Sequence, residues 1–247
     1  IGRLFYEPNL WRLNFGIFTL HLVLMAGFVV IPTILTEEMD ISPDNLWWVY
    51  LLLIGGGFFT MLPVMILGEK YRRQKISFVA AVAIMAILMT LLAFCRGSLV
   101  TGFMLWLFFA AFNLLEAMLP SWLSKACPAG QKGTAMGIYS TSQFLGAFAG
   151  GILGGWSLQQ YGIDGLFVLL AVILSIWSLV ALGLQTPRAL QTVVLNVGDM
   201  VHEKFAKLIL NVPGVEDILI VKGEQLAYAK VDKKTVDMSS LKPYLNR

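Results

Sequence analysis

The stretch SFVAAVAIMAILMTLLAFC, residues 77–95, contains no charged residue and is long enough to cross a bilayer as one helix. A transmembrane helix needs about 20 consecutive, mostly apolar residues, because the hydrocarbon core is about 30 Å thick. The whole chain shares this character: 57% of its 247 residues are hydrophobic and 13% are charged, against about 25% charged in soluble domains. We therefore predict an all-α membrane bundle.

Five further segments of this kind occur, separated by polar or Pro/Gly-rich breaks. The six predicted spans are residues 13–35, 46–67, 76–95, 100–124, 134–156 and 163–184. Residues 189–247 differ, since they hold 8 of the 18 basic and 7 of the 15 acidic residues. We predict two domains, a six-helix transmembrane domain over 1–187 and a small soluble domain over 188–247. Because the chain begins with isoleucine rather than methionine, we expect it to be a fragment of a longer protein.

Basic residues in the short loops predict which side of the membrane each loop occupies, because cytosolic loops are enriched in Lys and Arg. The flanks and loops on one side hold nine basic residues, and those on the other side hold only Arg96. Both ends of the chain are therefore predicted to be cytosolic. The net charge of +3 is typical of a membrane protein with basic cytosolic loops, so we expect no nucleic-acid partner.

One charged residue, Glu116, lies well inside a predicted span, roughly 5 Å from the middle at 1.5 Å per residue. A carboxylate at this depth must be protonated, paired or in contact with water, because a free charge in lipid is costly. We predict that Glu116 couples proton movement, and that His21 is a second candidate, since histidine titrates near physiological pH. The alternative is a structural carboxyl group hydrogen-bonded to a neighbouring helix.

The remaining polar residues are concentrated in the first, fourth and fifth spans, whereas the third and sixth spans are almost purely apolar and are predicted to face lipid. Polar residues within spans usually face a bundle interior or a water-filled cavity. The repeated order of spans predicts an inverted repeat of three helices, as in secondary transporters. GxxxG pairs in the fifth span predict close helix packing. The predicted substrate-cavity residues are Asn14, Asn113, Tyr139 and Gln143.

The segment LPSWLSKACPAGQKGTAMGIYSTSQFLGAFAGGILGG (119–155) resembles the C-terminal half of major facilitator superfamily transporters, especially the drug:proton antiporter-like branch. The loop MILGEKYRRQK (65–75) resembles a degenerate copy of that superfamily's motif G-x-x-x-D-R-x-G-R-K. Met65 and Arg72 replace its two glycines. The resemblance implies a conformational-switch loop formed by Glu69, Lys70, Arg72 and Arg73. The alternative is that these basic residues serve orientation alone.

The same resemblance implies half of a twelve-helix fold, located in the inner membrane of a bacterium and facing lipid. Its partners would be protons, a small hydrophobic or amphipathic substrate, and an N-terminal six-helix half that this chain lacks. The implied function is proton-driven secondary transport by alternating access, with export as the expected direction. The alternative is a non-transporting scaffold or sensor. The sequence contains no ATP-binding P-loop and no recognisable catalytic set, so neither an enzyme nor a cofactor is predicted.

The soluble segment follows the order β-α-β-β-α, which is typical of a ferredoxin-like fold. We predict a strand at 190–197, an amphipathic helix at 198–212, a turn at 222–224 and a second helix capped by Ser239 or Ser240. The predicted apolar face of the first helix consists of Met200, Val201, Phe205, Leu208 and Ile209.

The segment around this first helix also resembles heavy-metal-associated domains but lacks the cysteines of their M-x-C-x-x-C motif, which excludes thiolate ligation there. A weak alternative is a harder metal at His202 and Glu203, but the prediction is no metal. The tail is predicted to bind the cytosolic face of the transporter or another copy, with a partner strand or a small ligand as alternatives.

Overall fold

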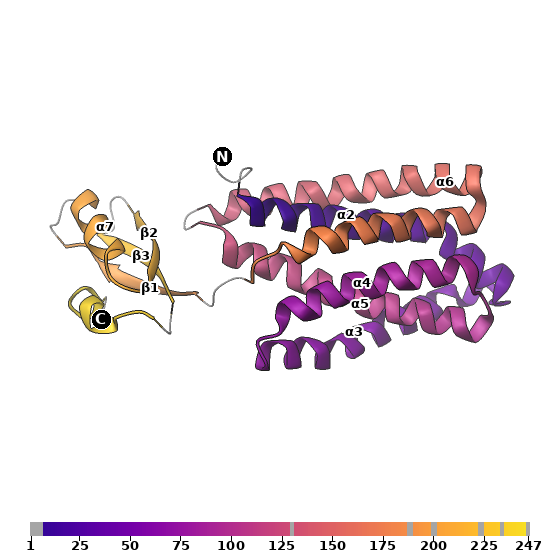
Figure 1. Ribbon diagram of the computed structural model, residues 1–247, viewed down its shortest axis with the longest axis horizontal. Coiled ribbons are helices and arrows are strands. Elements are labelled where there is room, and N and C mark those ends of the chain that lie inside the picture. Colours follow the sequence, from indigo (N-terminus) through magenta and orange to yellow (C-terminus); the bar gives the residue numbers. More distant parts are fainter. Residues whose placement is uncertain are drawn as a thin grey trace. The chain divides into compact units, whose positions relative to one another are not determined.

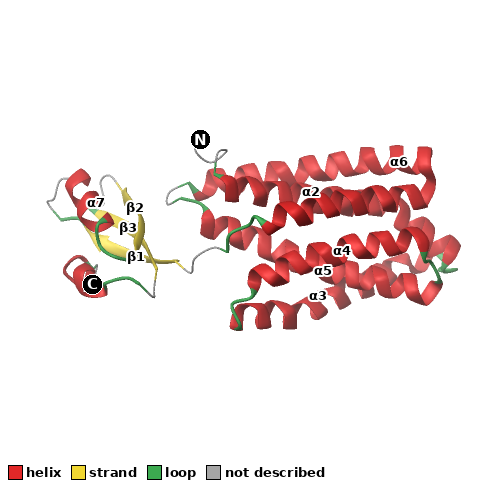
Figure 2. Ribbon diagram, viewed as in Figure 1, coloured by secondary structure: helices red, strands yellow, loops and turns green. Residues whose placement is uncertain are grey.

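A computed structural model describes residues 7–128, 131–186, 190–198, 202–221, 225–232 and 235–245. The chain forms two compact units, residues 1–122 with 137–186 and residues 123–136 with 187–247. The first unit is helical, and the second contains a three-stranded sheet (Figure 2). The predicted domain boundary at residue 187 lies outside the described residues.

Five helices in the described part of the chain are long and apolar enough to cross a membrane. They are α2 (Pro8–Thr33), α3 (Leu46–Lys70), α4 (Gln74–Phe94), α5 (Ser98–Ala126) and α6 (Lys132–Leu182). A π-helical turn, η1 (Ile34–Glu38), follows α2, and a 3-10 turn, η2 (Pro43–Asn45), precedes α3. These positions agree with the first four predicted spans to within a few residues.

The helix α6 has 51 residues and is interrupted at Gly162, where φ is 67° and ψ is −168°. This conformation is not helical, and glycine adopts it readily because it has no Cβ. The chain reverses direction at this point, so that two limbs of α6 run side by side (Figure 1). The predicted fifth and sixth spans lie on either side of the break.

The third predicted span, α4, is buried on one face and exposed on the other, so its contact with lipid stays a prediction for the exposed face. In α4, Phe78 is buried whereas Ile84 and Ile87 are exposed. Phe78 stacks on Trp122 of α5 with ring centroids 5.2 Å apart and meets Trp177 of α6 edge-on at 6.1 Å. Both tryptophans are almost fully buried. The core thus joins α4 and the second limb of α6 to α5.

Close contact between α2 and α6 depends on glycine. A Cβ atom added to Gly146, Gly150 or Gly154 would lie 2.8 Å from a Cα atom of α2, well inside the normal carbon–carbon contact distance of about 3.5–4.0 Å. The α2 residues are Phe18, Leu22 and Ala26, respectively. A Cβ atom on Gly151 or Gly155 would meet nothing within 4 Å. Of the overlapping GxxxG pairs in the sequence, one set therefore packs against α2.

The second unit contains β1 (Leu190–Asn196), α7 (His202–Leu210), β2 (Val215–Val221), β3 (Leu226–Asp232), α8 (Met238–Leu241) and η3 (Lys242–Tyr244). The sheet is antiparallel with the order β1-β3-β2. An isolated bridge pairs Leu245 with Leu195 of β1. The buried core of the second unit consists of Leu195, Val197, Phe205, Ile209, Ala227, Ala229, Val231 and Leu241.

Three details of this unit differ from or fall outside the predictions. Leu208 is 43% exposed, so the buried face of α7 is narrower than predicted. The N-cap of α8 is Asp237, whose carboxylate accepts a bond from the Ser239 backbone N–H, rather than Ser239 or Ser240. A carboxylate caps a helix well because it accepts hydrogen bonds from the free N–H groups of the first turn. The predicted turn at 222–224 and the side chains of Met200 and Val201 lie outside the described residues.

Candidate functional site

Three polar side chains from three different helices meet within the first unit. The Gln143 side-chain nitrogen of α6 lies 2.8 Å from His21 Nε2 of α2 and donates to Glu116 Oε1 of α5 at 3.3 Å. His21 Nδ1 lies 3.8 Å from the second carboxylate oxygen, Glu116 Oε2. The His21 side chain is 13% exposed and that of Glu116 is 37% exposed. The two titratable residues predicted from the sequence are therefore joined through one amide.

The glycine contacts between α2 and α6 make this cluster possible. They begin at Gly146, less than one helical turn after Gln143, and hold the two helix backbones in direct contact. At this separation the Gln143 side chain reaches His21 directly. The third member comes from α5, in which Glu116 precedes Pro120 by four residues. Proline has no N–H, so the backbone carbonyl of Glu116 lacks its usual helical donor.

The hydrogen bonds of the cluster are consistent with two proton arrangements. In the first, Glu116 is ionised and His21 is neutral, and the two amide protons of Gln143 serve both acceptors. When Glu116 gains a proton and the neutral imidazole of His21 carries its hydrogen on Nε2, both groups become donors toward Gln143. The Gln143 amide then accepts from both through its oxygen after turning by half a rotation. The arrangement can therefore hold and release a proton on Glu116 while keeping its hydrogen bonds.

Several buried polar atoms of α2, α5 and α6 lack a hydrogen-bond partner among the described residues. They include Asn14 Oδ1, Glu116 Oε2 and the Tyr139 hydroxyl. The Tyr139 side chain is otherwise buried, with 4% of the residue exposed. Buried polar groups normally have partners, and each exception calls for an explanation. These atoms are chemically suited to bind a polar group of a solute.

Asn113 is not part of the cluster, although it shares a helix face with Glu116. Its side-chain nitrogen donates to the backbone oxygen of Ile54 at 3.0 Å and so connects α5 to α3. The amide oxygen and the second N–H of Asn113 remain to contact a substrate.

The loop between α3 and α4 forms a tight turn even though arginine replaces glycine. Arg72 has a φ of 55°, its N–H bonds the Glu69 carbonyl at 3.1 Å, and the Arg73 N–H bonds the Gly68 carbonyl at 2.8 Å. This pair of bonds is the Schellman pattern that ends many helices, usually with glycine in the left-handed position. Glu69, Lys70, Arg72 and Arg73 form no ion pair with described residues, and Lys70 Nζ lies 5.6 Å from the Tyr71 ring. The turn therefore tolerates the replaced glycine.

A second charged cluster lies at the opposite ends of the helices and is absent from the predictions. Arg96 Nε lies 3.2 Å from Glu38 Oε1, and its guanidinium lies 2.6 Å from Asp164 Oδ1. These residues belong to the loop before α5, the turn after α2 and the turn within α6. Arg96 is also the one exception in the loop-charge pattern. The sequence signal that could have predicted this cluster is the presence of acidic residues in the loops on the same side as Arg96.

Comparison with known proteins identifies relatives of this chain. Residues 13–216 match the family model of the Major Facilitator Superfamily. The chain is 37% identical over 241 residues to the inner membrane transport protein YajR of Escherichia coli (strain K12), covering 96% of this chain and 52% of that protein. It is also 37% identical over 141 residues to the uncharacterized transporter BU466 of Buchnera aphidicola subsp. Acyrthosiphon pisum (strain APS), covering 57% and 36% of the two chains. The chain spans about half the length of YajR and a smaller part of the Buchnera protein.

Proposed function

Because this chain belongs to the major facilitator superfamily, we propose that it is the C-terminal half of a proton-coupled secondary transporter. Its partner is an N-terminal half of six helices, and the two halves expose a central cavity to each side of the membrane in turn. The proposal is supported by similarity that covers 96% of this chain but 52% of YajR. A small, hydrophobic or amphipathic substrate leaves the cell by this route.

We further propose six membrane crossings with both ends in the cytosol. The break at Gly162 supports two crossings within α6, and the nine basic residues on one side support the orientation. The tail is a ferredoxin-like domain, which is supported by the sheet order and by the bridge from Leu245 to β1. It regulates transport by docking on the cytosolic face or on another copy.

The observation that carries the proton-coupling proposal is the hydrogen-bonded set of Glu116, Gln143 and His21. Glu116 and His21 share the transported proton, and Gln143 relays its presence by turning its amide. In the same proposal, Asn14 and Tyr139 contact the substrate through their free polar atoms. Polar groups on facing helices within a membrane are expected to mark such a pathway.

The loop between α3 and α4 is proposed to act as the conformational switch. Glu69, Lys70, Arg72 and Arg73 are free to pair with charged groups of the N-terminal half in one conformation and to release them in the other. Their exposure and the fixed turn at Arg72 support this role.

The test uses the full-length protein in proteoliposomes with a pH gradient. A pH-sensitive dye inside the vesicles reports proton flux when a panel of hydrophobic cations and neutral amphipathic compounds is added. We expect Glu116→Gln to abolish substrate-linked proton flux, whereas the control Glu37→Gln, in an exposed turn, leaves it unchanged.

Intact pH-dependent transport in the Glu116→Gln protein would refute the role of Glu116. If no compound produced proton flux in the unaltered protein, the scaffold or sensor function would be favoured instead.

A further inference from the structure

A groove of about 450 Å³ lies between α3 and α4, with α5 as its floor. The groove is lined partly by small side chains, Ala81 of α4 and Ala110 and Ala111 of α5, each at most 8% exposed. Alanine ends at Cβ, so these positions leave depth between the larger residues of the walls. Walls such as Leu67 and Ile84 are 50% and 44% exposed. The groove is thus an apolar channel that opens to the outside of the bundle.

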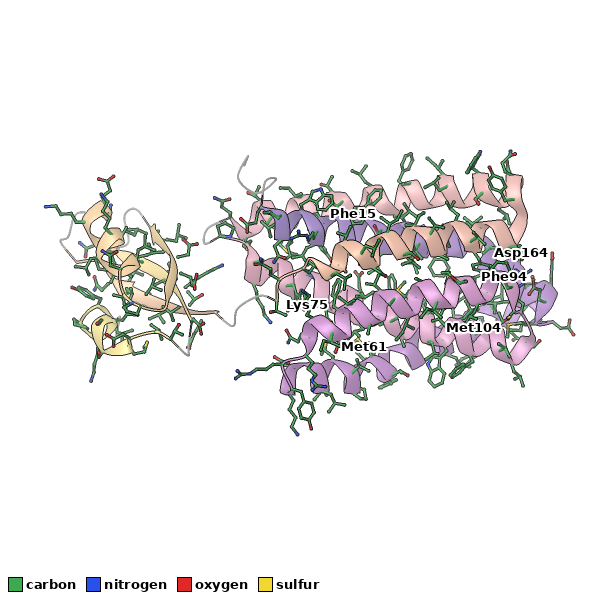
Figure 3. All side chains as sticks on the ribbon, in the orientation of Figure 1. Phe15, Met61, Lys75, Phe94, Met104 and Asp164 are labelled. Carbon is green, nitrogen blue, oxygen red and sulfur yellow. The ribbon has the colours of Figure 1, made fainter. Side chains whose placement is uncertain are left out.

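The groove has the length of one leaflet. Its lining on α3 extends from Thr60 to Tyr71, roughly 16 Å at 1.5 Å per residue. The hydrocarbon core of a bilayer is about 30 Å thick, so the groove covers about half of it. Its polar end is at the basic loop, on the side where Figure 3 labels Lys75, and the opposite end of the bundle carries Asp164.

The charged part of the lining is near that end, whereas the hydroxyl of Thr60 at the other end donates to the Gly56 carbonyl. Arg73 and Ser77 contribute to the wall at the basic loop, beside Tyr71. The segment from Glu69 to Lys75 contains four basic residues and one acidic residue, a net charge of +3. A guanidinium presents several donors in a plane and is well suited to bind phosphate oxygens. Basic clusters beside a membrane helix also attract anionic lipids.

The groove is separate from the polar cluster. Its α5 residues include Ala110, Ala111 and Leu114, which lie on one face of the helix. Glu116 follows Leu114 by two residues, a rotation of about 200° at 100° per residue. It therefore points to the other side of α5. The exposed part of the α4 wall is apolar, as expected for a surface in contact with lipid.

We propose that this groove is a binding site for one anionic phospholipid, whose acyl chain fills the channel and whose phosphate binds Arg73 and Ser77. The length of the channel fits a chain from one leaflet, and the charge of the loop fits the headgroup. The site requires only the described helices and does not depend on the transport function.

The test measures lipid retained by the full-length protein, by native mass spectrometry after purification from vesicles of phosphatidylglycerol or phosphatidylcholine with identical acyl chains. We expect preferential retention of phosphatidylglycerol. Arg73→Gln should weaken this preference about tenfold, as loss of a charge-assisted hydrogen bond predicts. The control Lys75→Gln makes the same charge change in the same loop but at a residue that does not line the groove, and should have a much smaller effect.

Two further measurements separate the possible sources of binding. Ala111→Leu fills the floor and should reduce retention of both lipids, and free glycerol phosphate should not compete. Equal effects of Arg73→Gln and Lys75→Gln, equal retention of both lipids, or competition by glycerol phosphate would overturn the proposal. A photoactivatable phosphatidylglycerol should label α3 or α4, and failure to do so because the rest of the protein covers the groove would also overturn it.

Discussion

Substitution of Gly150 by alanine is expected to push α2 and α6 apart and to break the polar cluster. The new Cβ atom would lie 2.8 Å from the Leu22 Cα atom, whereas carbon atoms in contact are about 3.5–4.0 Å apart. Relief of this clash requires a separation of about 1 Å. The same movement would lengthen the 2.8 Å contact between Gln143 and His21 beyond the range of a hydrogen bond.

The expected cost is about 1–3 kcal/mol, as for other overpacked cores. It is partly offset because alanine is the better helix former, by up to about 1 kcal/mol. Gly151→Ala is the matched control, since its Cβ atom would meet nothing within 4 Å and only the helix-propensity gain remains. Gly150→Ala should therefore lower the free energy of unfolding and Gly151→Ala should raise it, so that the two variants differ by about 2 kcal/mol.

The assay is reversible unfolding in mixed detergent micelles, followed by far-UV circular dichroism, with the full-length protein and both variants. A second readout is the nitrogen NMR signal of His21, assigned in a protein whose other histidine is replaced, because it reports whether Nε2 keeps its hydrogen bond. Equal unfolding midpoints for the two variants, or an unchanged His21 signal in the Gly150→Ala protein, would contradict the proposed helix contact.

Three further predictions concern other parts of the chain. Arg72→Gly should stabilise the protein by about 1 kcal/mol, since a side chain at φ 55° is strained, whereas Arg73→Gly should not; thermal unfolding distinguishes them. Arg96→Gln should lower stability by about 1 kcal/mol through loss of two carboxylate partners, and the difference should shrink in high salt. Two serine hydroxyls hold the pKa of Asp237 below its usual value, so its contribution to stability is present above about pH 4 and is lost as pH falls through the lowered pKa. Protection from hydrogen exchange at the start of α8, after correction for the pH dependence of intrinsic exchange, should fall there in the native protein but stay constant in Asp237→Asn.

Membrane-spanning segments and the soluble character of the tail could be predicted from the sequence because both follow from local composition. A run such as residues 77–95 has to be helical in lipid, since every backbone N–H and C=O group must be bonded within the segment. The family resemblance, carried by residues 65–75 and 119–155, was confirmed by the match over residues 13–216. The orientation of the termini and the roles assigned to Glu116 and His21 remain predictions.

Three local features were wrong, missed or left open, and one of them, the Arg96 cluster, depends on neighbours distant in the sequence. The cap of α8 was assigned to serine because Asp237 lies before the expected start of the helix. Arg96 seemed a mere exception to the charge pattern, since its partners are about 60 residues away on either side. At Arg72 the left-handed backbone conformation is kept although arginine replaces the glycine of the basic loop motif. The replacement therefore weakens the sequence motif but does not remove the turn.

The sequence by itself determined that Glu116 lies within a predicted membrane-spanning helix, at a depth where a free carboxylate is costly. It also showed many glycines in the fifth span, in overlapping GxxxG pairs. The spacing of these pairs did not tell which of them face a neighbouring helix. Only the tertiary structure decided that Gly146, Gly150 and Gly154 face α2 and that Gln143 joins His21 to Glu116. The physical reason is that burial in lipid depends on the composition of one segment, whereas a hydrogen bond between helices depends on their rotation and separation, which packing sets.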